Sequence, residues 1–305
     1  KPKIYTDEKG VPVMFDIKRQ RGLFEQEGLN IYQVNFNGRE IELVKLGDSY
    51  KGTGKNKRWL NLGLFKIVSG IKTGNNSEYL RCIDDCQKSF GLVNKKYILH
   101  DKEIETLTDD EKKNGIKSKL QRFIPFEMGM PSNIKDGVLP QYFQENTKIV
   151  IDWSRETVKR MRKEKHSDLA NEEFRFLKGH ISFSRIGQYA PTFRIEVAPI
   201  FDSAVPKIFM PRNLIYKYMG ILNSKLIKFL FKSYIDHSVS SQVEEIKDIS
   251  LLNKNDNNFI KKLTEKIIVK QEQNPQYNYI TNEQLEIDKL IYEMYNLNEE
   301  DIEEV

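Results

Sequence analysis

The segment Gly70–Asn76, GIKTGNN, collects several side chains that bind polar ligands. Two glycines, Gly70 and Gly74, would let the backbone approach a ligand closely. Ammonium, hydroxyl and amide groups of this kind contact the phosphates and base edges of nucleic acids, so the segment is a candidate DNA-reading loop. Its candidate contact residues are Lys72 for phosphate and Thr73, Asn75 and Asn76 for base edges.

A second polar segment, Lys178–Arg194, has the sequence KGHISFSRIGQYAPTFR. Arginine can hold guanine through two hydrogen bonds, and glutamine or asparagine can do the same for adenine. Composition alone favours ordinary solvated loops for both segments, with glycines for turns and arginines for solubility. The candidate contact residues of this second segment are Ser182, Ser184, Arg185, Gln188 and Arg194.

Catalytic and cofactor motifs are incomplete. The stretch KGTGK is not a phosphate-binding P-loop, because that motif needs a glycine where Ser49 stands and a serine or threonine where Asn56 stands. Asn274–Tyr277, NPQY, differs at its third position from the Asn-Pro-Pro-Tyr loop with which amino-methyltransferases hold a flipped adenine. No glycine-rich strand-loop-helix for S-adenosylmethionine precedes it. We therefore interpret it as a polar linker.

Composition limits the class of protein. A chain of 305 residues with 39% hydrophobic and 30% charged residues can bury a sizeable core. No apolar run approaches the roughly 20 residues that span a bilayer, so we expect a soluble, cytoplasmic protein. The histidines are scattered, and we expect Cys82 and Cys86 to be reduced thiols rather than a disulfide or a zinc site.

Charge is distributed unevenly along the chain. Residues 178–242 contain nine Lys/Arg and three Asp/Glu, a net charge of +6, whereas residues 286–305 contain one Lys and eight acids, a net charge of −7. A polyanion would be attracted to the first of these segments and repelled by the last.

The hydrophobic pattern predicts a mixed α/β (α+β) fold, a strand-rich recognition half followed by a helical half. Strand patterns occur at residues 31–46, 59–68, 148–153 and 193–197, and the run 105–115 reads as a turn or a helix start. Helical spacing occurs at residues 213–233, 258–271 and 282–295. We expect a connector or the end of a methyltransferase domain at 1–58, a DNA target recognition domain at 59–212, and a helical scaffold with a tail at 213–305.

Several short motifs follow one another from Trp59 to the end of the chain. After GIKTGNN, an aromatic residue and an arginine stand at Tyr79 and Arg81. The later motifs are RFIPFEMG (122–129), IDWS (151–154), KGHISFSRIG (178–187), PIFDSAVPKIF (199–209), GILNSKLIKFL (220–230), SSQVEEIKDI (240–249) and EIDKLIYEMYNLNEEDIEEV (286–305). In this order the motifs resemble the C-terminal target recognition domain, the TaqI-like specificity domain, of adenine-specific DNA methyltransferases of the type IIG restriction and BREX phage-defence kind.

The resemblance implies a domain that lies against the major groove of double-stranded DNA, beside the methyltransferase domain of a parent protein. It adds Arg81 to the candidate DNA contacts, with Lys228 and Gln242 in or after the helix at 213–233. The chain lacks the cofactor-binding motif, so we expect no cofactor in it and no methylation by it alone. We expect S-adenosylmethionine in a catalytic domain that precedes Lys1, and the chain itself to be a fragment.

Two other functions remain open. A basic surface could dock an acidic partner in a defence complex, which would make the chain a protein-interaction module. A stand-alone nuclease would need clustered acids and a lysine, and Asp152 with Glu164 and Lys165 offers such a set. The last two residues lie in the charge run RKEKH, which we interpret as a solvated helix.

Overall fold

The structure is a computed structural model that describes residues 5–6, 12–13, 31–36, 39–44, 59–62, 65–84, 89–128, 141–145, 147–185, 190–236, 241–252 and 258–305. It divides into two compact units. The first unit comprises residues 1–67, 186–192 and 213–305, and the second comprises residues 68–185 and 193–212. The second unit ends at residue 212, where the sequence analysis places a boundary, and the expected connector 1–58 is grouped with the helical part.

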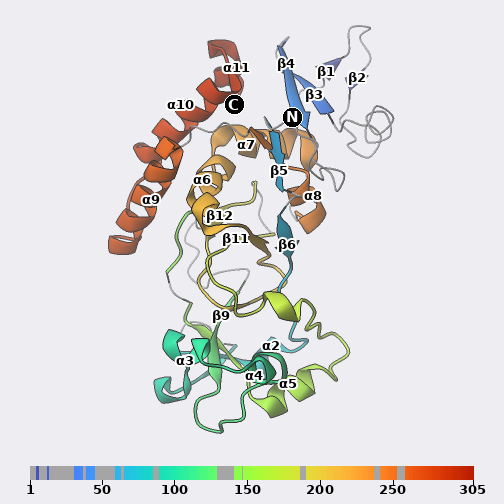
Figure 1. The fold of residues 1–305 in the computed structure, drawn as a ribbon, viewed down its shortest axis with the longest axis vertical. Helices are drawn as coiled ribbons and strands as arrows, with labels where there is room; N and C mark the ends of the chain where they lie inside the picture. The colour runs from blue at the N-terminus through green and yellow to red at the C-terminus, as the bar shows by residue number, and fades with distance from the viewer. Residues whose placement is uncertain are drawn as a thin grey trace. The chain divides into compact units, whose positions relative to one another are not determined.

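Two β-sheets organise the second unit (Figure 1). Within the described residues, their strand orders are β13-β9-β10-β7-β8 and β12-β11-β14-β6, and β6 spans the boundary between the units. The elements are β6 (Lys66–Val68), α2 (Asn76–Tyr79), β7 (Leu80–Cys82), β8 (Gly91–Leu92), the 3-10 turn η2 (Lys95–Tyr97), α3 (Asp101–Glu105), α4 (Asp109–Asn114), β9 (Phe123–Glu127), β10 (Ile149–Asp152), α5 (Arg155–Met161), the 3-10 turn η3 (Glu172–Phe174), β11 (Ile181–Phe183), β12 (Phe193–Ile195), β13 (Ile200–Phe201) and β14 (Lys207–Phe209).

Strand β10 lies at the centre of the first sheet. It pairs antiparallel with both β7 and β9, while β13 pairs parallel with β9. Ile149 and Ile151 belong to one buried apolar cluster, whereas Val150 joins Ile98 in a second cluster, as expected when successive side chains point to opposite faces. Burial of both faces explains why this stretch reads as a continuous apolar run, and each such side chain contributes about 1.5–3 kcal/mol.

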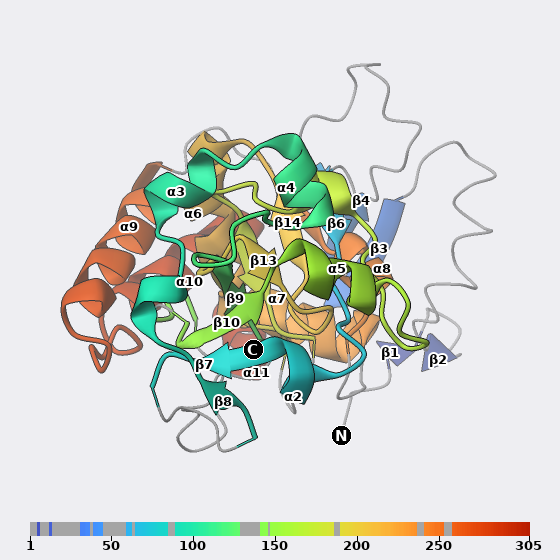
Figure 2. The ribbon, with the colours of Figure 1, turned by 90° about the horizontal axis from the view of Figure 1, so that it is seen from below.

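Helices α4 and α5 lie beside each other (Figure 2) and begin at hydroxyl caps. Thr108 Oγ1 accepts a hydrogen bond from Glu111 N at 3.3 Å, and the Glu111 carboxylate accepts one from Thr108 N at 3.2 Å, which forms a capping box. Ser154 Oγ accepts from Thr157 N at 3.3 Å at the start of α5. The helix start expected in residues 105–115 is therefore confirmed.

The first unit consists mostly of helices with short strand pairs. The hairpin β3-β4 and the antiparallel pair β15-β5 account for the strand patterns at 31–46 and at Trp59. The elements are β1 (Tyr5–Thr6), β2 (Pro12–Val13), β3 (Ile31–Phe36), β4 (Arg39–Val44), β5 (Trp59–Asn61), α6 (Arg212–Leu222), α7 (Lys225–Leu230), the π-helical turn η4 (Phe231–Ile235), α8 (Val243–Lys247), β15 (Ser250–Leu252), α9 (Asn258–Gln273), α10 (Glu283–Tyr295) and α11 (Glu299–Glu304). The predicted mixed α/β class is thus confirmed.

The helix predicted at residues 213–233 is interrupted after Leu222. Ser224 Oγ accepts from Ile227 N at 3.3 Å and starts a new helix, α7. The buried Asp288 carboxylate of α10 accepts from Lys225 N at 2.9 Å, so it satisfies an amide that has no partner inside the helix. Burial raises the pKa of Asp288, and the hydrogen bonds that it accepts from Lys225 N and from the Gln284 side chain oppose the shift.

Cys82 corrects a second expectation. It is disulfide-bonded at the end of β7, where the sequence predicts a reduced thiol. Cys86, the other cysteine of the chain, lies outside the described residues. Spacing in the sequence does not show whether two cysteines reach the Cα separation of roughly 5.5 Å that a disulfide needs. Among the described helices, none is both long and apolar enough to span a membrane.

Candidate nucleic-acid interface

The Gly70–Asn76 loop runs between β6 and α2. Ile71 N donates to Phe201 O at 2.8 Å, and Lys72 and Asp168 exchange two backbone hydrogen bonds, each of 2.8 Å. The Lys72 side chain itself is exposed. The backbone of this loop is therefore fixed on both sides while its lysine remains accessible to a ligand.

Side-chain hydrogen bonds give the four polar candidates of the loop different roles. Thr73 is 3% exposed and donates from Oγ1 to Asn76 Oδ1 at 2.5 Å. Asn75 is held at both ends of its amide, since it donates to Glu78 at 3.3 Å and accepts from Ser77 at 2.9 Å. The Asn76 side chain is exposed, and Thr73 occupies its Oδ1. The buried Thr73 therefore orients Asn76 rather than contacting DNA, which corrects the expectation for Thr73.

The glycines of the loop also differ from expectation. A Cβ atom on Gly70 would lie 2.6 Å from Asp202 O and closer still to the backbone of Phe201, so the close neighbour of Gly70 is protein rather than ligand. Gly74 has a φ of +79°, and a Cβ there would lie 3.1 Å from Ser167 N. Both glycines shape the loop instead of opening it to DNA.

Arg81 closes the short helix α2. Its Nη1 donates to the carbonyl oxygens of Ser77, Glu78 and Leu80 at 3.2, 2.8 and 2.7 Å. Carbonyl groups at the end of a helix lack partners inside it, so Arg81 satisfies them and fixes the end of the loop. Nη1 is thus engaged within the loop, and DNA contact by the half-buried Arg81 stays a prediction of the sequence analysis.

A basic segment, Arg155–His166, lies directly beside this loop. Ser167 Oγ donates to Lys72 O at 3.0 Å, and Tyr79 Oη donates to Glu164 at 3.1 Å. Burial and the hydrogen bond to Glu164 raise the pKa of Tyr79 to about 12, so its hydroxyl stays protonated and keeps donating. The segment carries six Lys/Arg and two Glu.

The exposed charges of the basic segment separate into paired and unpaired groups. Arg160 forms an ion pair with Glu78 at 2.8 Å, and Arg162 forms one with Glu172 at 3.0 Å. Lys159, Lys163 and Lys165 are exposed and form no ion pair within the part of the chain that the structure describes. The sequence analysis interprets the charge run RKEKH, residues 162–166, as a solvated helix. These residues are exposed, but α5 ends at Met161 and they form turns, which corrects the helical part of that interpretation.

The second polar segment lies mostly in the interior. Ser182, Ser184 and Arg194 are at most 3% exposed, and Ser182 Oγ and Arg194 Nη2 both donate to Glu127, at 3.1 and 3.2 Å. Arg194 Nη1 donates to Ser184 Oγ at 3.1 Å. A buried side chain bonded to other protein groups cannot contact a base edge, so the expectation that these three residues bind DNA is corrected.

Charge compensation explains how this buried group is tolerated. Lys207, 0% exposed, lies 2.8 Å from Glu196 and 3.6 Å from Glu127, so two acids face two bases. Burial lowers the pKa of Arg194 and raises that of Glu196, and the opposite charges counteract both shifts. The remaining candidates of the segment are Arg185, which is half-exposed and donates from its backbone to Ala204 O at 3.1 Å, and Gln188, which lies outside the described residues.

Two candidates belong to the first unit. Lys228 lies on α7, where burial lowers its pKa to about 8 against an opposing effect of Asp288. Gln242 is exposed at the start of α8, and its backbone N donates to the Glu245 carboxylate. DNA contact by Lys228 and by Gln242 stays a prediction of the sequence analysis.

The NPQY tetrapeptide forms part of the connection between α9 and α10. Tyr277 Oη donates to Glu283 at 2.7 Å, and Lys270 Nζ lies 3.0 Å from the same carboxylate. Burial alone would raise the pKa of Glu283, but hydrogen bonds from Tyr277, Lys270 and Lys266 outweigh it and bring the pKa to about 2. The tyrosine is thus bonded within the connection, in agreement with the linker interpretation.

The acids that suggested a nuclease have separate structural roles. Asp152 pairs with Arg122 at 3.2 Å and accepts from Ser154 N at 2.9 Å, whereas Glu164 accepts from Tyr79. Among the residues that the structure describes, no group of three or more His, Cys, Asp or Glu residues is placed to hold a metal ion.

Comparison with known proteins adds no relative: neither the models of protein families nor the curated proteins contain a match to this chain.

Proposed function

We propose that the chain is the DNA-recognition part of an adenine-specific DNA methyltransferase of a restriction-modification or phage-defence system. One observation carries the proposal: the Gly70–Asn76 loop is hydrogen-bonded to the segment that follows α5, so an exposed amide and unpaired lysines occupy one region of the second unit. The order of motifs that resembles TaqI-like domains supplies the enzyme class. S-adenosylmethionine would be held by a catalytic domain of the parent protein.

Phosphate contacts and base contacts would come from different residues of this region. Lysines 72, 159, 163 and 165 would neutralise phosphates and fix the register of the duplex. Asn76 would read one base edge in the major groove, with its NH2 group as donor because Thr73 occupies its oxygen. A binding free energy more favourable by about 4–10 kcal/mol for the recognised sequence than for random DNA would help the parent enzyme extrude its target adenine.

Replacing the three unpaired lysines of the basic segment with glutamine, as Lys159→Gln/Lys163→Gln/Lys165→Gln, is expected to weaken binding to all duplexes. The slope of log K against log salt should fall in magnitude by about one for each lysine that contacts phosphate. Fluorescence anisotropy with random-sequence duplex DNA across a salt series measures this.

A matched triple variant in the same unit, Lys95→Gln/Lys96→Gln/Lys102→Gln, removes the same charge from exposed positions outside the region. It should bind nearly as the parent chain does. Equal losses in both triple variants would show only a general charge effect, and tight binding to an acidic protein but not to DNA would favour the interaction module.

Asn76→Ala is expected to relax recognition at one base pair, by about 1–3 kcal/mol of discrimination, while Lys72→Gln weakens all sequences alike. Selection of a consensus from a random DNA pool, followed by binding to single-base variants of that consensus, measures the difference. A uniform loss for Asn76→Ala would contradict direct reading of a base. Arg185→Ala tests the remaining described candidate of the second segment in the same way.

A further inference from the structure

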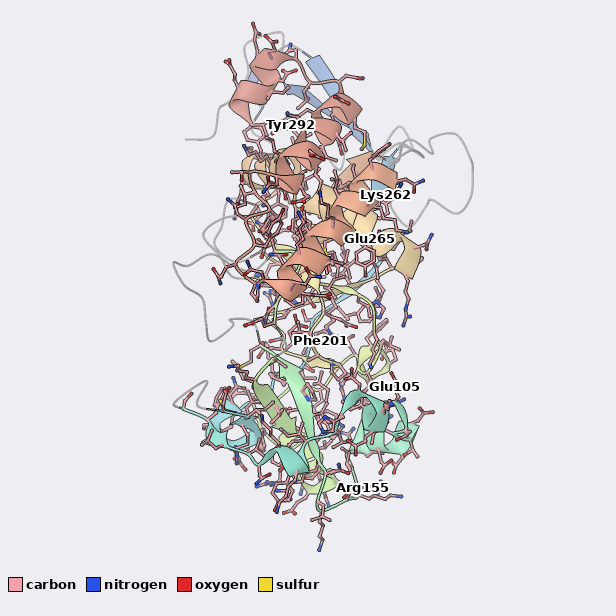
Figure 3. The ribbon with its side chains drawn as sticks, turned by 90° about the vertical axis from the view of Figure 1, so that its left-hand side faces the viewer. Glu105, Arg155, Phe201, Lys262, Glu265 and Tyr292 are labelled. Atoms are coloured by element: carbon pink, nitrogen blue, oxygen red, sulfur yellow. The ribbon has the colours of Figure 1, made fainter. Side chains whose placement is uncertain are left out.

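A cavity of about 420 Å³ opens at the surface of the second unit, and none of the proposed DNA contacts lines it. One part of its wall is apolar, with Phe176 and Leu177, and the other part is basic, with Lys112, Lys178 and Arg212 beside His180. The residues come from α3, α4, the stretch between η3 and β11, and the first residue of α6. Figure 3 labels one of them, Glu105 of α3.

His180 has an unusual environment in this wall. Both ring nitrogens are buried and have no hydrogen-bond partner in the described part of the chain, and the ring lies 4.1 Å from that of Phe209. Burial, reinforced by Lys207 and Arg212, lowers the pKa of His180 to about 4, so the ring is neutral at neutral pH. A neutral imidazole carries no charge, and its two nitrogens are closed off from solvent, so the ring adds an uncharged surface to the wall.

The basic side chains of the wall differ in whether an acidic side chain already pairs with them. Lys178 is paired with Glu105 at 3.0 Å and with Asp101 at 3.8 Å, so much of its charge is compensated. The side chains of Lys112 and Arg212 form no hydrogen bond or ion pair with any residue that the structure describes. Arg212 crosses the backbone at Gly179, where a Cβ would lie 3.2 Å from its Nε.

We propose that this cavity binds a small organic phosphate of nucleotide size. The phosphate would lie between Arg212 and Lys112, because the planar guanidinium fork matches phosphate oxygens and a lysine supplies a second charge. A flat ring would cover Phe176 and Leu177, beside the neutral ring of His180. The volume is within the range of about 300–1,000 Å³ that small-molecule sites occupy. The site is independent of the proposed DNA interface.

Calorimetric titration of the full chain with adenosine monophosphate tests the proposal. We expect binding that weakens at least tenfold in Arg212→Gln, and binding of adenosine or inorganic phosphate alone that is weaker by a similar factor. Lys102→Gln, which removes an exposed charge from α3 outside the cavity, should bind as the parent chain does. Circular dichroism verifies that each variant is folded, and the NMR signal of the His180 ring should shift on titration.

Absence of binding, or equal affinity in the parent chain and Arg212→Gln, would overturn the proposal. Competition by duplex DNA that Arg212→Gln abolishes would overturn it too, because the phosphate of the site would then belong to DNA. The triple lysine variant of the basic segment should still bind the nucleotide, so failure of the DNA proposal and failure of this one give different results.

Discussion

Glu127→Ala is expected to lower the free energy of unfolding of the second unit by about 3–5 kcal/mol, a large part of the stability of a typical domain. Glu127 is 0% exposed and lies at the end of β9. Its carboxylate accepts hydrogen bonds from Ser182, Arg194 and the backbone N of Val197, at 3.1, 3.2 and 3.4 Å. Lys207 adds an ion pair at 3.6 Å.

The cost arises from the charge that the variant leaves behind. Without Glu127, the fully buried guanidinium of Arg194 retains only the bond from Nη1 to Ser184 Oγ among its described contacts. Lys207 is affected less, because Glu196 lies 2.8 Å and the Ala198 carbonyl oxygen 2.6 Å from its ammonium group. An uncompensated buried charge is among the few mechanisms that produce losses of this size from a single substitution.

Urea denaturation in a Trp59→Phe background measures this loss. The chain has two tryptophans, so the background leaves the buried Trp153 of the second unit as the fluorescent probe. Glu156→Ala, which removes an exposed glutamate from α5, is the matched control and should change the unfolding free energy by no more than about 0.5 kcal/mol. A loss for Glu127→Ala as small as that of the control would contradict the role assigned to the buried charges.

A double variant separates lost charge compensation from lost packing. Glu127→Met/Arg194→Met replaces both charges with apolar side chains of similar length and leaves Lys207 with Glu196. Replacing a whole buried ion pair is often close to neutral, so the double variant should be more stable than Glu127→Ala by about 2 kcal/mol. If the stability losses of the single variants Glu127→Met and Arg194→Met simply add in the double variant, the two charges are not coupled.

The sequence pattern predicted those strands and helices whose formation depends on residues close to one another in the chain. The apolar run at 148–153 became β10, and the helical spacing at 258–271 and 282–295 became α9 and α10. Each of these carries a periodic signal that a window of a few residues contains. The single helix predicted at 213–233 is divided at Ser224, whose hydroxyl caps α7. Asp288, 63 residues from Lys225 in the chain, accepts a further hydrogen bond there, which no local pattern shows.

The prediction of the candidate site was limited in the same way, because burial there depends on contacts between residues far apart in the chain. Ser182, Ser184 and Arg194 have the composition of a solvated loop, and their burial depends on Glu127, 55 and 67 residues away from the first and last of them. Conversely, the charge run RKEKH of the basic segment was interpreted as a solvated helix because its sequence gives no indication of a neighbour. Its position follows from backbone pairing between Lys72 and Asp168, which no local pattern specifies.

Gly70→Ala is expected to destabilise the second unit by about 2–3 kcal/mol, because the new methyl group has no space. Its Cβ would lie 2.5 Å from the carbonyl carbon of Phe201, which Figure 3 labels, and 2.6 Å from Asp202 O. These are backbone atoms, so no side-chain rotation can relieve the overlap. The segment must move away from β13 and weaken the bond from Ile71 N to Phe201 O.

Gly91→Ala is the matched control for this overlap. Gly91 lies on β8 in the same unit, and the nearest neighbour of its Cβ would be the flexible side chain of Arg81 at 3.4 Å. Its stability should change by less than about 1 kcal/mol, in either direction. The Trp153 fluorescence assay compares the stabilities of the two variants. A second measurement, salt-dependent DNA binding of Gly70→Ala well below its unfolding transition, reports whether the position of Lys72 and Asn76 depends on this contact. Equal stabilities of the two glycine variants would show that the loop can move from β13 without cost.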